Sequence, residues 1–199
     1  MHWTWLSLLA ICAPAAAHAE PARDDLVDVA PLIPDAVLDL RYATTDNFTG
    51  ERLYPRAVCK LRYAVAEQLV VAAKALRAQH RRIVLWDCYR PASVQRVLWK
   101  HRPDPKYVAD PKVGSVHSRG AAVDLGLADE TGALVALPTA YDAATPDAAR
   151  TRALDGDHGR EARTLDAAMT AAGFVGLPTE WWHYDFATKQ PFALSDAPL

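Results

Sequence analysis

A histidine and an aspartate lie seven positions apart in a stretch of small and apolar residues, GSVHSRGAAVDLGL at 114–127. An ionised carboxylate such as Asp124 in apolar surroundings costs several kcal/mol unless a cation, a metal or several hydrogen bonds compensate it. The alternation of a strand that begins at Gly120 turns Asp124 away from the apolar core face and toward a cleft. His117 then lies in the preceding loop, from which it can fold back toward Asp124. The pair alone is compatible with a hydrogen-bonded histidine and aspartate or with a metal site.

A second group of polar side chains lies far downstream, in the aromatic segment EWWHYDF. Glu180 precedes His183 by three residues, where aromatic neighbours can exclude water. Two histidines and one carboxylate form a three-ligand zinc set that leaves one position open for water, as in catalytic zinc sites. Zinc lowers the pKa of such a water to about 7, and a further carboxylate can act as general base and then as general acid toward a leaving amine. Glu180 is the carboxylate left for that role, and a solvated loop position is its alternative interpretation.

Arg90 directly follows an apolar run, in the segment WDCYRP. Its guanidinium could donate two hydrogen bonds to the oxyanion of a tetrahedral intermediate. A salt bridge to Asp87 or to a C-terminal carboxylate is the alternative, and the sequence alone does not choose between these partners.

Helical and extended patterns that could position these residues follow one another along the chain. Apolar residues at helical spacing predict a helix over 62–79, and a proline at the favoured first-turn position predicts another from Pro91 to about Lys100. A third helix is predicted over 161–172, where Gly173 ends it. Predicted strands span 83–90, 120–127, 132–142 (hairpin-like) and 174–186, after an irregular lead-in over 26–57 with one short strand. These elements predict an α+β fold, a single domain with a small, mostly antiparallel sheet flanked by helices.

Composition limits the classes of partner. The 199 residues carry a formal net charge of −2 and are 51% hydrophobic, which fits one domain with a substantial core. Without a basic stripe to neutralise phosphates, the sequence predicts no nucleic-acid partner. We expect His80, His101 and His158 at the surface because each has charged neighbours. The sequence predicts no particular oligomeric state.

The start of the chain, MHWTWLSLLAICAPAAAHA, is an apolar run that ends in small residues. The A-x-A pattern at 17–19, followed by the charged segment EPARDD, predicts a secretory signal peptide over 1–19. A buried N-terminal helix is the alternative. No later stretch is long enough to span a membrane. We therefore expect a mature domain over 20–199 that is exported, to the periplasm, without stable membrane insertion.

Cleavage of the signal would remove Cys12 and leave an even pair, Cys59 and Cys88. An oxidising compartment favours a disulfide between them. Such a bond would close a loop of about thirty residues and stabilise the fold by roughly 3 kcal/mol in the chain-entropy model. Two separate buried thiols are the alternative.

Taken together, these motifs resemble those of one peptidase family. The ordered string Ser115-x-His117-x-x-Gly120-x-Ala122-x-Asp124, with Glu180-x-x-His183 far downstream, is similar to the signature of the D-alanyl-D-alanine dipeptidases. These are zinc enzymes related to D,D-carboxypeptidases and to the hedgehog signalling domain. The similarity extends through DLRYATTDNFTG, WDCYRP and PTAYD, so it covers most of the predicted mature domain.

The resemblance implies a role for each matching residue. It implies zinc (Zn²⁺) as the cofactor, with His117, Asp124 and His183 as ligands. Glu180 corresponds to the catalytic base and Arg90 to the residue that stabilises the transition state. Asp142 in PTAYD resembles the carboxylate that holds the free amino group of a small dipeptide, and Ser115 matches a residue of the substrate pocket. The preference for D-amino acids rests on the resemblance alone.

We therefore expect zinc-dependent hydrolysis of D-alanyl-D-alanine to two molecules of D-alanine, with Glu180 as general base and acid. One alternative is a zinc D,D-carboxypeptidase or endopeptidase that acts on peptidoglycan peptides. A second is a non-catalytic zinc-containing binding module, and a third is a nucleophile at Cys59 or Cys88. A buried carboxylate opposite the substrate ammonium would favour the dipeptidase, because an acylated amino end would leave that charge unpaired.

Overall fold

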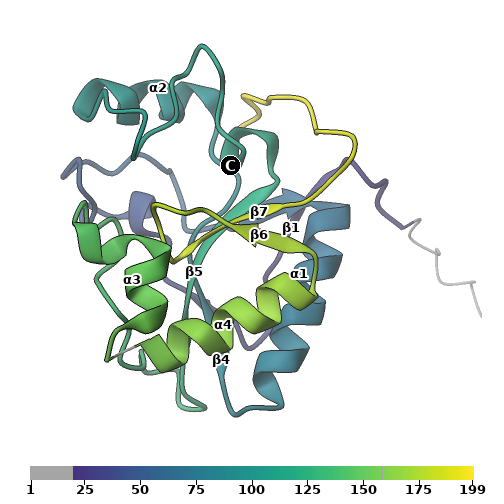
Figure 1. Ribbon diagram of the computed structural model, residues 1–199. Helices are drawn as coiled ribbons and strands as arrows, with labels where there is room; N and C mark the ends of the chain where they lie inside the picture. The colour runs from purple at the N-terminus through teal and green to yellow at the C-terminus, as the bar shows by residue number, and fades with distance from the viewer. Residues whose placement is uncertain (1–19, 158) are drawn as a thin grey trace, which may run out of the picture.

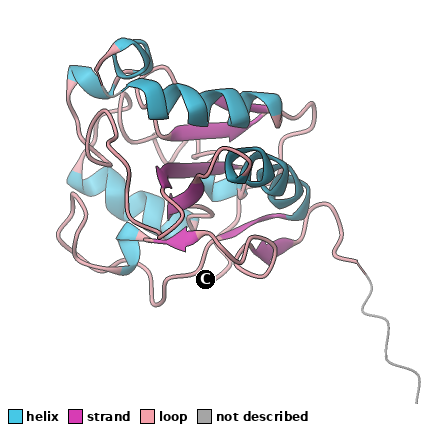
Figure 2. Cartoon of the chain, turned by 90° about the horizontal axis from the view of Figure 1, so that it is seen from below, coloured by secondary structure: helices cyan, strands magenta, loops and turns pink. Residues whose placement is uncertain are grey.

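A five-stranded sheet forms the centre of the protein, with helices around it (Figure 2). The computed structural model describes residues 20–157 and 159–199, so the predicted signal peptide and His158 lie outside the described residues. The strands in spatial order are β2 (Val37–Leu38), β4 (Arg82–Asp87), β5 (Ala122–Ala128), β7 (His183–Phe186) and β6 (Phe174–Gly176). Only the β2–β4 pair is parallel; the other three pairs are antiparallel. The predicted α+β class and mostly antiparallel sheet are confirmed.

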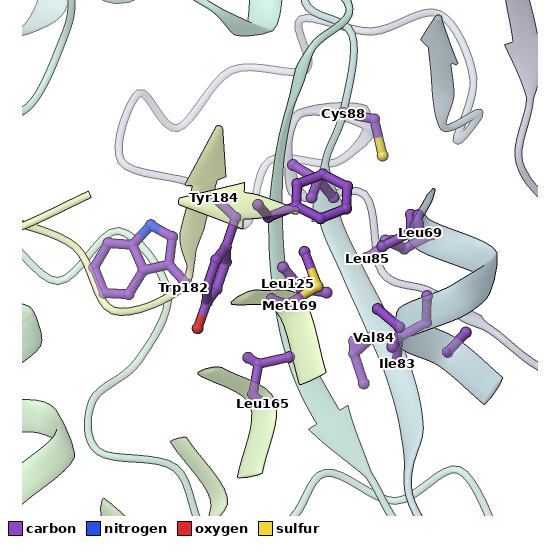
Figure 3. Close-up of a cluster of buried hydrophobic side chains, with 14 of the residues drawn as sticks. Leu69, Ile83, Val84, Leu85, Cys88, Leu125, Leu165, Met169, Trp182 and Tyr184 are labelled. Atoms are coloured by element: carbon purple, nitrogen blue, oxygen red, sulfur yellow. The ribbon is translucent and has the colours of Figure 1, made fainter. Parts of the chain in front are cut away.

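Two helices, α1 (Tyr63–Arg77) and α4 (Gly159–Ala171), pack against each other and against the sheet (Figure 1). Their buried side chains meet those of the central strands in one core, where Leu69, Met169 and Leu125 gather (Figure 3). Burying a side chain of this size stabilises the fold by about 1.5–3 kcal/mol. The helix pair therefore holds β4 and β5 in place from one side.

The remaining elements are short. The other helices are α2 (Ala92–His101), α3 (Arg150–Asp155) and the 3₁₀ turns η1 (Arg41–Ala43), η2 (His117–Arg119) and η3 (Pro146–Ala148). β1 (Leu26–Asp28) pairs antiparallel with β3 (Lys60–Arg62) outside the main sheet. The three predicted helices are confirmed to within two residues, α3 was not predicted, and the lead-in holds two short strands instead of one.

β5 is buried on both faces, which refines the expectation of a face open to a cleft. Val123, Leu125 and Leu127 belong to the core, as the alternation predicts. On the other face the Trp86 ring lies so close to Gly126 that a Cβ there would be 2.4 Å from it. The end of this face near Asp124 borders a cavity.

The predicted strand over 132–142 is wrong. Only an isolated antiparallel bridge forms, between Leu134 and Ala128 at the end of β5. β4 occupies one edge of β5, but β7 occupies only Ala122–Asp124 of the other edge. The segment contacts the rest of that edge only at this bridge and through the Val135 N–H, which donates to the Leu127 carbonyl at 3.1 Å. Pro138 also lacks the N–H group that a strand would need.

The single aromatic strand predicted over 174–186 is also wrong. The segment forms two antiparallel strands, β6 and β7, with Phe174 opposite Phe186. Pro178 lies in the connection, where it interrupts the extended run. The hairpin places His183 next to β5 in the sheet.

A disulfide joins Cys59 and Cys88, as predicted, with their Cα atoms 5.3 Å apart. It connects the residue before β3 to the residue after β4. Within the ranges that the structure describes, no helix has the length and apolar character that a membrane span requires.

Candidate active site

Three neighbouring strands carry one row of polar residues across the sheet. Asp87 on β4 lies opposite Asp124 on β5, and Asp124 lies opposite His183 on β7. Simple alternation would turn Asp87 to the same face as Leu85, but the register shifts between these two residues. Such a β-bulge redirects a side chain. The bulge therefore brings Asp87 to the face that carries Asp124.

His117 reaches this row from the η2 turn that precedes β5. Gly120 ends the turn in a left-handed conformation with φ of +69°, and a Cβ there would lie 2.7 Å from the Leu26 side chain. Glycine is favoured in this conformation and leaves room for that contact. The turn folds His117 back, as the sequence predicts, until its Nε2 lies 3.3 Å from Asp124 Oδ1.

Each of the three polar side chains uses one atom for a partner outside the group and turns another atom toward the other two side chains. His117 Nδ1 donates to the Cys88 carbonyl at 2.7 Å, and His183 Nε2 donates to Asp185 Oδ1 at 2.9 Å. The Tyr141 hydroxyl donates to Asp124 Oδ2 at 3.0 Å. The atoms left over are His117 Nε2, His183 Nδ1 and Asp124 Oδ1.

These three atoms converge. His183 Nδ1 lies 3.0 Å from Asp124 Oδ1 and 3.1 Å from His117 Nε2. All three residues are buried, and they form a group that could hold a metal ion. Two imidazole nitrogens and a carboxylate oxygen suit zinc, and hydrogen bonds that fix the outer ring nitrogens are typical of metal-binding histidines. The donor set therefore fits a divalent metal ion.

The electrostatics of the cluster favour positive charge. Burial acts to raise the pKa of Asp124, but the neighbouring His117 and His183 outweigh it and hold that pKa well below its usual range. Burial acts to lower the pKa of His183, but hydrogen bonds to Asp124 and Asp185 raise it to about 10. Protons on the histidines or a divalent cation can supply the positive charge that balances the neighbouring carboxylates.

A cavity of about 340 Å³ opens beside the cluster. This size suits a small ligand. Every residue that the sequence singled out for the site lines it: Arg90, Ser115, His117, Asp124, Asp142, Glu180 and His183. The disulfide cysteines do not line the cavity, although the Cys88 carbonyl orients His117. His80 is exposed beside Glu130, and His101 lies 3.5 Å from Glu51, away from the cluster.

Glu180 presents a carboxyl group to this cavity. No side chain within 20–157 or 159–199 forms a hydrogen bond or ion pair with it at the distances that define those contacts. Burial raises its pKa to about 8, with His183 acting in the opposite direction and Asp124 adding to the rise. A carboxyl group with a raised pKa and no fixed partner can accept and release a proton near neutral pH.

Arg90 forms a salt bridge to Asp87, one of the partners that the sequence left open, and still lines the cavity. Its Nε and Nη2 donate to Asp87 Oδ2 at 2.9 and 2.6 Å, and its Nη1 donates to Gln95 Oε1 at 2.8 Å. Nη2 also lies 4.0 Å from Asp124 Oδ2. The salt bridge therefore holds the guanidinium at the cavity wall instead of removing it from the site.

Asp142 and Ser115 occupy other parts of the wall. Asp142 adopts a left-handed backbone with φ of 58°, a conformation that aspartate tolerates better than most residues. The Tyr42 hydroxyl donates to its Oδ2 at 2.8 Å. Burial and the charge of Asp124 raise its pKa to about 7, against the hydrogen bond from Tyr42. Ser115 Oγ accepts a hydrogen bond from the His117 backbone N–H at 3.2 Å.

Sequence reasoning missed the residues that hold the site residues in place. Tyr54 donates to Asp87 at 2.6 Å, and Asp87 is fully buried. Tyr141 and Gln95 were not singled out either. Only Asp87 had a signal in the sequence, its position three residues before Arg90. Tyr54 and Tyr141 contact the site from distant segments, whereas Gln95 contacts Arg90 from the helix that follows it.

Comparison with known proteins shows the family to which this chain belongs. A family model described as D-ala-D-ala dipeptidase matches residues 22–196. The chain belongs to this family of peptidases. Three curated relatives of this dipeptidase-family chain carry the name D-alanyl-D-alanine dipeptidase. The protein from Escherichia coli K12 is 36% identical over 181 residues, which cover 85% of this chain and 89% of the relative.

The other two relatives are more distant. The Enterococcus faecium protein is 32% identical over 170 residues, covering 73% of this chain and 83% of its own length. The Streptomyces coelicolor protein is 32% identical over 197 residues, covering 81% and 91% respectively. The chain is therefore a metallopeptidase of a family that hydrolyses a dipeptide, and its cluster of two histidines and an aspartate is the candidate metal site.

Proposed function

We propose that this chain hydrolyses D-alanyl-D-alanine to two molecules of D-alanine, with a zinc ion held by His117, Asp124 and His183. One observation carries the proposal: three ligand atoms converge beside Glu180, a carboxyl group without a fixed partner in the same cavity. When bound, zinc supplies Lewis acidity and lowers the pKa of a coordinated water toward neutrality. The names of the relatives support the dipeptide as substrate.

Asp142 binds the ammonium group of the dipeptide. Its carboxylate lines the cavity and is oriented by the Tyr42 hydroxyl. An N-acylated peptide cannot supply the matching positive charge and would leave a partly buried carboxylate unpaired, at a cost of several kcal/mol. Ser115 lies on the same wall, where its hydroxyl can donate to the substrate. Asp142 therefore selects a free dipeptide over a chain whose amino end is acylated.

Glu180 moves the proton during hydrolysis. It takes a proton from the attacking water as the new C–O bond forms, and it gives that proton to the leaving amine as the C–N bond breaks. Arg90 has five N–H groups, of which three are used by Asp87 and Gln95. The remaining two, one on each terminal nitrogen, donate to the oxyanion of the tetrahedral intermediate.

Replacement of the proton carrier tests this chemistry. We expect Glu180→Gln to lower kcat by roughly two to four orders of magnitude, while zinc content, measured by elemental analysis, stays the same. Glu130→Gln is the matched control, because Glu130 is 73% exposed and lies away from the cavity. Near-normal turnover in Glu180→Gln would eliminate the proposed role.

A panel of substrates tests the specificity. We expect cleavage of free D-alanyl-D-alanine and no cleavage of its N-acetylated form or of L-alanyl-L-alanine. Efficient cleavage of the acetylated compound would assign the chain to carboxypeptidase activity instead. No metal-dependent cleavage of any of the three would favour a binding module.

We also propose that residues 1–19 are a signal peptide and that the mature protein is exported to the periplasm. The Cys59–Cys88 disulfide supports this, because such bonds persist mainly in oxidising compartments. Fractionation of cells that produce the full chain, followed by N-terminal sequencing, should give periplasmic protein that begins at Glu20. Uncleaved protein confined to the cytoplasm would contradict the proposal.

A further inference from the structure

Gln95 is a buried polar residue that the catalytic chemistry does not use. It lies on α2, is 1% exposed and does not line the cavity. Its side-chain amide nevertheless connects two parts of the cavity wall. Oε1 accepts from Arg90 Nη1 at 2.8 Å, and Nε2 donates to the Ala109 carbonyl at 2.7 Å. Arg90 and Ala109 both line the cavity.

The contact with Arg90 completes a support that Asp87 begins. Asp87 engages the guanidinium along one edge, through Nε and Nη2, and both bonds end on the same oxygen, Oδ2. A planar group held at one oxygen can still rock about that point. Gln95 contacts the remaining nitrogen, Nη1, from another element. The two supports together fix the plane of the guanidinium and therefore the direction of its two free N–H groups.

The contact with Ala109 fixes Gln95 itself. Ala109 belongs to the proline-containing connection between α2 and η2, and its neighbour Val108 is buried in a cluster with Tyr89 and Leu98. The amide of Gln95 thus has both of its ends attached to well-packed parts of the molecule. A glutamine with one free end would lose more side-chain entropy for each hydrogen bond that it formed with Arg90.

We propose that Gln95 is a positioning residue for Arg90: it holds the guanidinium in the plane that the oxyanion requires and ties it to the cavity wall at Ala109. This inference rests on the proposed function, in which Arg90 stabilises the oxyanion. Gln95 touches neither the substrate nor the metal ligands, so its effect reaches the reaction only through Arg90.

The test begins with Gln95→Met, which keeps the length of the side chain and removes both hydrogen bonds. We expect kcat to fall about 10- to 100-fold, the range seen for supporting groups around active centres, with KM within about twofold of the wild type. The affinity for a phosphinate analogue of the dipeptide, which carries a tetrahedral oxyanion, should fall by the same factor as kcat/KM. Zinc content and the affinity for D-alanine should not change. Lys100→Met, an exposed position on the same helix, is the matched control.

A double-mutant cycle with Arg90→Lys separates this inference from the proposed function. Lysine lacks the planar group that Gln95 holds, so Gln95→Met should lower kcat less than about twofold further in the Arg90→Lys background. An equal loss in both backgrounds, or a normal kcat in Gln95→Met, would overturn the positioning role. A normal kcat in Arg90→Lys would instead overturn the oxyanion role of Arg90. If Gln95→Met does not fold, Gln95→Asn, which withdraws the amide by one methylene group, replaces it in the same cycle.

Discussion

The two faces of β5 are both buried, but their side chains are held in different ways. Toward α1 and α4, Val123, Leu125 and Leu127 pack in the apolar core. On the opposite face Asp124 accepts from Tyr141 and lies against two histidines. Apolar packing is nondirectional and tolerates substitutions of similar volume. A buried polar cluster needs every partner. The comparison teaches that one strand can carry packing residues on one face and the candidate metal site on the other.

The largest effect should follow from changing the polar face. We expect Asp124→Ala to lower kcat/KM by roughly three orders of magnitude or more, because it removes one of the three proposed metal ligands. Elemental analysis should show loss of bound zinc. The protein should remain folded by circular dichroism, because the apolar face of β5 is intact. If Asp124→Ala kept its full zinc content, the polar face of β5 would not be needed to hold the metal.

Changing the adjacent residue should give the opposite result. We expect Leu125→Ala to lower the free energy of unfolding by about 2–5 kcal/mol, through lost burial and a cavity between β5 and the helices. Its kcat/KM should stay within about twofold of the wild type at temperatures where the variant is folded. Urea unfolding of the zinc-loaded protein and steady-state kinetics at low temperature measure the two quantities. A large loss of activity in folded protein would mean that the faces are coupled.

A smaller effect is expected from Asp185, which contacts a proposed metal ligand and is not itself one. Asp185 accepts the hydrogen bond that leaves His183 Nδ1 free for a metal. Asp185→Asn should therefore weaken zinc binding about 10- to 100-fold, as measured by competition with a chelator. Asp147→Asn is the matched control: this side chain is 73% exposed, and its replacement should leave the zinc affinity unchanged. Equal affinities in all three proteins would show that the orientation of His183 does not depend on Asp185.

The smallest effect concerns pH. Burial raises the pKa of Asp142 to about 7, and only the ionised form can pair with the ammonium group of the substrate. KM should therefore fall, by up to about tenfold per unit, as pH rises to that value, and rise again above about 8 as the substrate amine loses its proton. A bound cation and the substrate both favour the ionised form, so the lower limb lies at or below 7. Asp142→Asn should raise KM and abolish the lower limb; an unchanged pH profile in this variant would exclude the pairing.

The comparison also explains how much the sequence could predict. The spacing of His117 and Asp124 was informative because strand alternation and a loop that ends at a glycine restrict their geometry. Asp87 could not be placed on the polar face, because alternation assigns it to the other one and a bulge redirects it. Tyr141 contacts Asp124 from another segment, and Gln95 contacts Arg90 from the helix that follows it; no local pattern signals either hydrogen bond. The predicted strand over 132–142 failed for a different reason: the segment pairs with β5 only at the bridge near Ala128, and Pro138 lacks the N–H group that a longer ladder would need.

The disulfide has a consequence for how the enzyme is prepared. Both sulfur atoms are buried, so a reducing agent can reach them only when the surrounding structure opens. The backbone carbonyl of Cys88 is also the acceptor that sets the tautomer of His117. Material produced in a reducing host should therefore contain molecules with free thiols whose histidine is less well oriented. Refolding with an oxidised and reduced glutathione pair, before zinc is added, should give a more uniform and more active preparation.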